Sequence, residues 1–184
     1  MDVMTVSMET RGMAWLRYKK KCLVVTTESG RPLNGDVVGY DGKFIYEIEI
    51  KQSFSDFKAD FRKIKKHQNM AVEKGMANYF TYLVVPEIAD KCLEFLQDYP
   101  KYGLMIPEPD LAWHSCRILK STRRIHNRSP HVRRIHDLQL RMASEQMAMR
   151  LGMESINGAF TGIVHALQVK HEETFGKIED NGTD

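Results

Sequence analysis

The chain has 184 residues, a formal net charge of +3, 42% apolar and 28% charged residues, a composition typical of a single globular domain. It contains no run of 18 apolar residues and no basic-then-apolar N-terminal segment, so we expect a cytoplasmic protein without a membrane span. Its three scattered cysteines lack CxxC spacing, which argues against a disulfide framework and against a structural zinc site.

The first part of the chain predicts a helix followed by three strands. The strands are indicated by β-branched runs and by an Asp-Gly pair that is typical of a tight hairpin turn. In the third strand apolar residues alternate with Glu47, Glu49 and Lys51, so these three polar side chains share one face. The expected elements are a helix at 8–21 and strands at 22–27, 36–40 and 43–51.

The rest of the chain predicts alternating helices and strands. Ser53 is a candidate N-cap, and Phe54, Phe57 and Phe61 recur at helical spacing behind it. Further elements are expected at 79–85 (strand), 87–99 (helix), 103–106 and 113–119 (short strands) and 132–151 (helix). The last helix is rich in methionine, which favours a core face, with a partner surface as the alternative. This order predicts an α/β (α+β) fold with a central mixed β-sheet flanked by helices.

Acidic side chains converge in the predicted hairpin. A two-residue turn at 41–42 would set Asp36 opposite Glu47 and diagonal to Glu49, with Lys51 at the end of the same face. Like charges across a ladder repel each other, and a bound divalent cation such as Mg²⁺ would turn that repulsion into coordination. The alternative is a half-solvated strand whose outer face carries ordinary charged residues.

The whole segment resembles the PD-(D/E)XK motif of the restriction-endonuclease-like nuclease superfamily. The resemblance lies in Asp36, in Glu49-Ile50-Lys51 and in the Ser-x-x-Asp-Phe-x-x-Asp helix start that begins at Ser53. It extends over about residues 9–106, is strongest from Asp36 to Pro86, and looks like a branch seen in bacterial DNA-repair-associated and phage proteins. The residue before Asp36 is Gly35, so the proline of the motif is absent.

The resemblance implies a restriction-endonuclease-like core and a role for each motif residue. Asp36, Glu49 and the main-chain carbonyl of Ile50 would bind Mg²⁺ or Mn²⁺, and Lys51 would complete the catalytic set. Glu47 is either a ligand of a second metal or a residue that faces solvent.

Three further residues are expected to support this set from a second layer. They are Ser53, Asp56 and Glu28, and Asp56 either holds Lys51 or simply caps the following helix.

The basic residues are unevenly distributed. Residues 117–141 contain eight Lys or Arg and one acid, a net charge of +7, whereas the remainder has 19 bases and 23 acids. Such a block favours a polyanionic partner, although a solvated helix face would have the same composition. The candidate phosphate contacts are Lys58, Lys65, Lys66, Arg123, Arg124, Arg133 and Arg134. Three histidines, His126, His131 and His136, do not share a helix face and are expected at the surface.

The leading hypothesis is therefore a metal-dependent DNA endonuclease that hydrolyses phosphodiester bonds in DNA repair, recombination or phage DNA processing. A DNA-binding protein of the same fold with little or no activity, and a protein-interaction module, are the alternatives. The expected organisation is one domain over 1–171, with a core at about 9–106, a basic helical part at about 117–151 and a polar tail at 172–184. A homodimer would allow both strands of a duplex to be cut.

Overall fold

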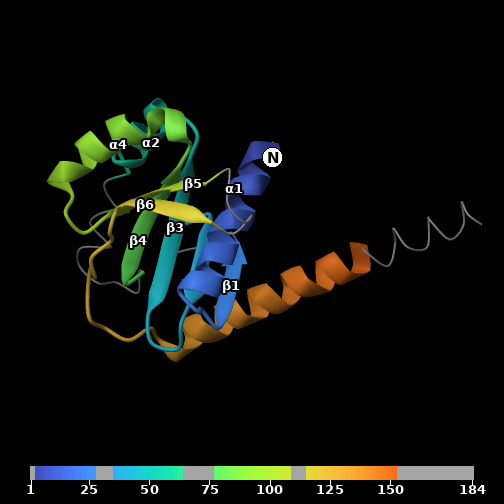
Figure 1. The fold of residues 1–184 in the computed structure, drawn as a ribbon. Helices are drawn as coiled ribbons and strands as arrows, with labels where there is room; N and C mark the ends of the chain where they lie inside the picture. The colour runs from blue at the N-terminus through green and yellow to red at the C-terminus, as the bar shows by residue number, and fades with distance from the viewer. Residues whose placement is uncertain (1–2, 28–34, 64–76, 109–114, 153–184) are drawn as a thin grey trace, which may run out of the picture. The chain divides into compact units, whose positions relative to one another are not determined.

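The computed structural model describes residues 3–27, 35–63, 77–108 and 115–152 (Figure 1). The chain divides into two compact units, Met1–Met142 and Ala143–Asp184, and the sheet and its covering helices belong to the first. Of the second unit, residues 143–152 are described, and they are helical. The predicted end of the domain at 171 and the predicted tail lie outside the described residues. No described helix has both the length and the apolar character that a membrane crossing requires.

A six-stranded mixed sheet forms the centre of the first unit, which confirms the predicted fold class. The strands follow one another in chain order across the sheet, with antiparallel pairs at both sides and the parallel pairs β3–β4 and β4–β5 in the middle. They are β1 (Val24–Thr27), β2 (Val37–Tyr40), β3 (Ile45–Lys51), β4 (Tyr79–Val84), β5 (Gly103–Pro107) and β6 (Cys116–Lys120).

The β2–β3 hairpin has the predicted length of turn, but its turn is centred one residue later than predicted. Tyr40 pairs with Ile45, and the side chain of Asp41 accepts hydrogen bonds from the main-chain N–H groups of Lys43 and Phe44. Gly42 takes a positive φ of 97° at the first turn position, as glycine does readily. Moving the centre by one residue changes the pairing by two, so every side chain keeps its predicted face.

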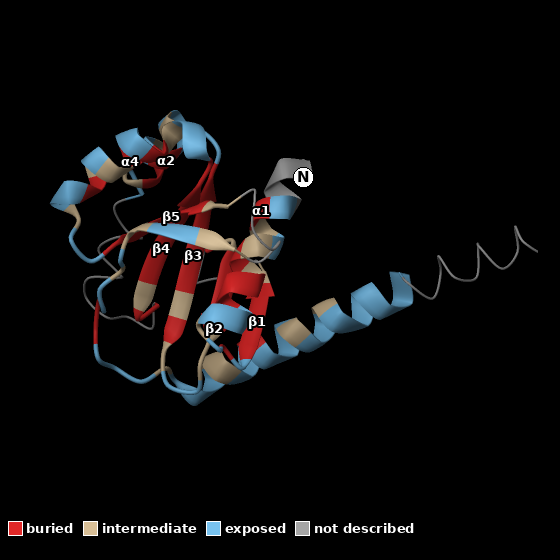
Figure 2. Ribbon diagram, viewed as in Figure 1, coloured by how far each residue is buried: buried red, intermediate tan, exposed pale blue. Residues whose placement is uncertain are grey.

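Helices cover both faces of the sheet (Figure 1). On one face, α2 (Phe54–Asp60) and α4 (Ala89–Phe95) pack on Phe80, Tyr82 and Val84 of β4. On the other face, α1 (Val3–Ala14) and the turn η1 (Trp15–Lys19) pack on alternate residues of β2, β3 and β4. Short turns η2 (Pro86–Ile88) and η3 (Leu96–Asp98) flank α4. Figure 2 shows that β3 and β4 are buried along most of their length.

The predicted apolar stripe of α2 is confirmed for its described members, because Phe57 is fully buried and Phe54 and Phe61 pack beside it. The methionine prediction is partly wrong. Residues 132–152 are helical, and Met142 packs on a small cluster with Leu138, but Met147 and Met149 are 66% and 67% exposed.

Candidate active site at the end of strand β3

The polar face of β3 is buried. Glu47, Glu49 and Lys51 are paired in the parallel register with Phe80, Tyr82 and Val84, so they point into the layer between the sheet and α2. Their exposed fractions are 1%, 4% and 5%. The alternative of a half-solvated strand, and with it the alternative of a solvent-facing Glu47, is therefore wrong.

Asp36 is held against β3 by its own carboxylate. The main-chain N–H of Ile50 donates to Asp36 Oδ2 over 2.6 Å, just beyond the point where the β2–β3 ladder ends at Val37 and Ile48. Continuing that register by one pair sets Asp36 opposite Glu49, where the predicted register placed it opposite Glu47. The direct neighbour of Asp36 across the hairpin is thus the glutamate of the motif itself.

Lys51 forms an ion pair with Glu49, its neighbour on the same face. Its Nζ lies 2.8 Å from Glu49 Oε1 and 3.5 Å from Asp56 Oδ2. Burial acts to lower the pKa of Lys51, but the charge and hydrogen bond of Glu49 and the charges of Asp60 and Asp56 outweigh burial and raise that pKa. Lys51 is therefore a fixed cation at neutral pH and stabilises negative charge better than it accepts a proton.

The predicted supporting residues differ in what they do. Ser53 caps α2, because its hydroxyl accepts the main-chain N–H of Asp56 over 3.2 Å. The exposed Asp56 carboxylate reaches Lys51, as one of the two expectations for it had it, whereas the cap of α2 is Ser53. Glu28 lies outside the described residues.

Asp60, the second aspartate of the Ser-x-x-Asp-Phe-x-x-Asp pattern, also belongs to this site. It is 1% exposed, it accepts a hydrogen bond from the Tyr82 hydroxyl over 2.8 Å, and Lys63 Nζ lies 2.9 Å from its other oxygen. Burial, together with the charge and hydrogen bond of Asp60, raises the pKa of Tyr82 far above its ordinary value, so Tyr82 remains a donor. The signal was its spacing, since Asp60 follows Phe57 by three residues and so falls on the buried side of α2.

The donor set at the end of β3 fits a hard divalent cation. No group of three or more Asp, Glu, His or Cys side chains in the described part of the chain is arranged to hold a metal. Two carboxylates, Asp36 and Glu49, with the main-chain carbonyl of Ile50, would nevertheless suit Mg²⁺, which commonly takes one or two carboxylates and keeps several waters. The Ile50 carbonyl points to the same side of β3 as its N–H, toward Asp36, because both groups of a strand residue face one neighbour.

The candidate phosphate contacts are spread over several elements. Lys58 is exposed on α2, and its Nζ lies 5.0 Å from the centroid of the Phe54 ring, whereas Lys65 and Lys66 lie outside the described residues. Arg123 and Arg124 are exposed on the segment that follows β6. Arg133 is exposed at the start of the helix over 132–152, while burial lowers the pKa of the half-buried Arg134.

The histidine prediction is wrong for His126. That side chain is 6% exposed, and its main-chain oxygen accepts a hydrogen bond from the buried amide of Asn78. His131 and His136 are exposed, as predicted.

Comparisons with known proteins establish the fold and no activity. The chain matches no known protein-family model, and no curated protein matches it. A solved structure with a similar fold is the SPO1766 protein of unknown function from Silicibacter pomeroyi, with a TM-score of 0.52 and 22% sequence identity. The similarity covers 80% of this chain and 90% of that chain.

Proposed function

We propose that this protein is a metal-dependent DNA endonuclease that hydrolyses phosphodiester bonds, with its active site at the carboxyl end of β3. The observation that carries the proposal is the meeting of three motif residues from two strands. Asp36 is fixed to Ile50 at the open end of the β2–β3 hairpin, and the next strand brings Glu49 and Lys51 to the same place. The resemblance of this motif to PD-(D/E)XK nucleases agrees with that placement.

Asp36, Glu49 and the Ile50 carbonyl would hold the metal. When bound, a Mg²⁺ or Mn²⁺ ion would polarise the scissile phosphate and lower the pKa of a bound water. The hydrogen bond from the Ile50 N–H keeps the Asp36 carboxylate in position without a loss of side-chain freedom on binding.

Lys51 would stabilise the negative charge that develops on the phosphate in the transition state. Its raised pKa keeps the ammonium protonated, and its burial makes each charge interaction stronger than it would be in water. Asp56 and Asp60 contribute to that raised pKa, so α2 helps to fix the charge state of the catalytic lysine.

A nuclease assay on labelled duplex, nicked, branched and single-stranded DNA tests this proposal. The wild type is compared with Asp36→Asn, Glu49→Gln and Lys51→Met, each with Mg²⁺, with Mn²⁺ and with a chelator. We expect metal-dependent cleavage that falls by about a hundredfold or more in each variant, the scale that loss of one transition-state contact commonly causes. Glu87→Gln and Lys91→Met, at exposed positions on η2 and α4, are matched controls for the change in charge.

The Glu49–Lys51 ion pair favours a second candidate function, a DNA-binding protein of the same fold with little or no activity. In that reading Lys51 takes the place of the metal as the counter-charge of Glu49. Wild-type protein that binds DNA and cuts none of these substrates with either metal would establish this second function and reject the first.

A further inference from the structure

A row of aromatic side chains lies at the opposite end of β3 from the candidate active site. Tyr46 and Tyr79, paired in the register of β3 and β4, stack with ring centroids 4.8 Å apart and planes at 8°. Phe44 meets Tyr79 edge-on at 5.8 Å. We call Phe44, Tyr46 and Tyr79 the aromatic row, and all three are half-buried, so each keeps an accessible part.

Cations lie over this row. The guanidinium carbon of Arg124 is 5.3 Å from the centroid of Phe44, and Lys43 Nζ is 5.2 Å from the same ring. Lys20 Nζ lies 5.7 Å from the centroid of Tyr46. Aromatic rings interleaved with cations are the combination that proteins use to hold unpaired nucleotides, because bases stack on planar groups while phosphates meet the charges.

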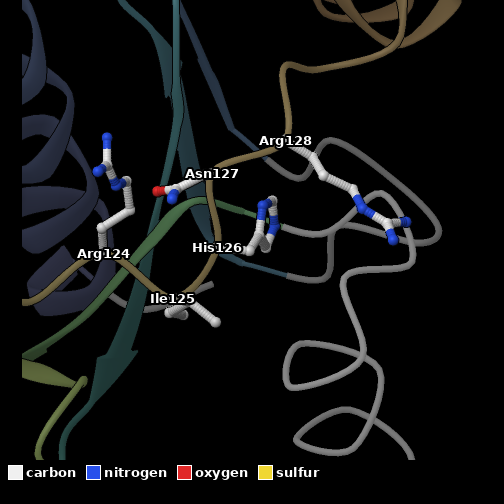
Figure 3. Close-up of a pocket in the computed structure, with 5 residues that line it drawn as sticks. All are labelled: Arg124, Ile125, His126, Asn127 and Arg128. Carbon is white, nitrogen blue, oxygen red and sulfur yellow. The ribbon is translucent and has the colours of Figure 1, made fainter.

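A groove of about 380 Å³ adjoins the aromatic row through Arg124 (Figure 3). It is lined by residues 124–128, which are part of the segment 121–131 that we call the basic loop. This loop carries Arg123, Arg124 and Arg128 and no acidic residue. In Figure 3 the side chains of Arg124 and Arg128 extend to different sides of the loop, as suits an extended polyanion better than one isolated phosphate.

The basic loop is anchored to the sheet. Asn78, which is 1% exposed, donates from its side-chain amide to the main-chain oxygens of His126 and Arg128. The main-chain N–H of Ile125 donates to Asn78 O over 2.8 Å, and Lys101 Nζ donates to Ile125 O over 3.0 Å. The main chain that carries the arginines is thus already ordered, which lowers the entropy cost of binding a ligand.

We propose that the basic loop and the aromatic row together bind single-stranded nucleic acid. The phosphate backbone lies in the groove against Arg124 and Arg128, and an unpaired base stacks on the Arg124 guanidinium beside Phe44. This inference deepens the proposed nuclease function by naming its substrate class, a nucleic acid with an unpaired segment. The surface is separate from the cleavage chemistry, since the length of β3 places it about 20 Å from Lys51.

Fluorescence anisotropy in chelator tests the proposal without any cleavage. The probe is an end-labelled oligothymidylate of about 15 nucleotides, within the range that such surfaces cover, and a duplex of equal length is the comparison. We expect tighter binding to the single strand, with an affinity that falls as salt concentration rises.

Two variants separate the phosphate contact from the stacking contact. Arg128→Ala should lower the slope of log affinity against log salt by about 0.7, the value for one phosphate contact on a single strand. Arg124→Lys keeps the charge and the slope but loses the planar guanidinium, so affinity should fall by about fivefold or more. Both positions are exposed, so neither change threatens folding, and Lys91→Ala on α4 is the control for loss of an exposed cation.

The outcomes are distinct from those of the nuclease assay. If Arg124→Lys and Arg128→Ala both bind the oligonucleotide as the wild type does, or if the duplex is bound more tightly than the single strand, the proposal is overturned. Binding that follows the expected pattern in a protein that never cuts would support this surface and reject the nuclease function. If the wild type cuts DNA but both variants bind the oligonucleotide as tightly as the wild type does, the nuclease function is supported and the binding surface is rejected.

Discussion

Gly35 lies directly against the side chain of Glu47. A β-carbon at position 35 would stand 2.2 Å from Cγ and 2.9 Å from Cδ of Glu47, closer than real β-carbons approach any atom. This contact gives a physical reason why glycine stands where the PD-(D/E)XK motif, which this segment resembles, has proline. Any residue other than glycine at position 35, proline included, would displace the buried glutamate.

Gly35→Ala is accordingly expected to destabilise the protein by about 1–3 kcal/mol, the usual cost of forcing extra atoms into a packed region. Chemical denaturation of both proteins measures the difference. Gly152→Ala is the matched control, because no heavy atom lies within 4 Å of a β-carbon there, and alanine favours a helix. Equal stability of Gly35→Ala and wild type would mean that Glu47 moves away at no cost.

The Glu49–Lys51 pair predicts strongly coupled changes in stability. Lys51→Met leaves the Glu49 carboxylate buried without its lysine. The free energy of unfolding should fall by about 3 kcal/mol, because removing one partner of a buried ion pair is more costly than replacing both partners. The double variant Lys51→Met with Glu49→Gln should recover part of that loss. A double-mutant cycle from denaturation midpoints measures the coupling, and purely additive effects would show that the ion pair adds nothing to folding.

The same pair gives a pH dependence of known sign. The folded protein raises the pKa of Lys51 above its value in the unfolded chain, which is about 10.4. The contribution of protonated Lys51 to folding stability is therefore complete below that unfolded pKa, and it is lost as the pH rises through the folded pKa. The stability difference between wild type and Lys51→Met should therefore be constant from about pH 7 to 9 and shrink at more alkaline pH. A difference that already shrinks near neutral pH would show that the pKa of Lys51 is lowered.

The cysteines should be slow to react in the folded protein. Burial is the main cause that raises the pKa of Cys22 and Cys92 to about 12 and that of Cys116 to about 11. The thiolate is the reactive form, so little of it is present near neutral pH. A disulfide reagent should label the native protein slowly and all three thiols after denaturation, as expected for free cysteines. Rapid labelling of the native protein would contradict this burial.

A conservative substitution of Asn78 is expected to have a large effect on folding stability. Its Oδ1 accepts the buried main-chain N–H of Ile45, and its amide faces the oxygens of His126 and Arg128. Asn78→Asp turns the donor toward those oxygens into a second acceptor, so we expect a loss of about 3 kcal/mol. Thermal unfolding measures it, with the exposed Asn127→Asp as control. Similar melting temperatures for the two variants would count against the anchoring role.

Local patterns were enough to predict the order of elements and the composition of the polar face of β3. Strict alternation placed Glu47, Glu49 and Lys51 together, and a two-residue side-chain period preserves that result even when the turn moves. The predicted register was wrong because the Asp41 side chain accepts the main-chain N–H groups of Lys43 and Phe44. These hydrogen bonds shift the turn to Gly42 and Lys43.

Long-range contacts were beyond any local pattern. His126 was expected at the surface because it lies in a basic, polar stretch, but its environment is provided by Asn78, 48 residues earlier. A solvent-exposed face for Glu47 and Glu49 stayed possible for the same reason. The atoms that bury these side chains belong to α2 and to the neighbouring strand β4. Asp60 was within reach, because its spacing from Phe57 already placed it on the buried side of its helix.

The anchoring of the basic loop by Asn78 has a kinetic consequence. A surface loop usually opens on its own, and its amide protons then exchange rapidly with solvent. Here the Ile125 N–H is bonded to Asn78, whose own N–H and Oδ1 pair with Ile45 at the start of β3. Release of the loop therefore breaks a hydrogen bond to Asn78, the residue that joins the start of β3 to the start of β4. The Ile125 amide should exchange as slowly as those of β3 and β4, as part of one cooperative unfolding unit.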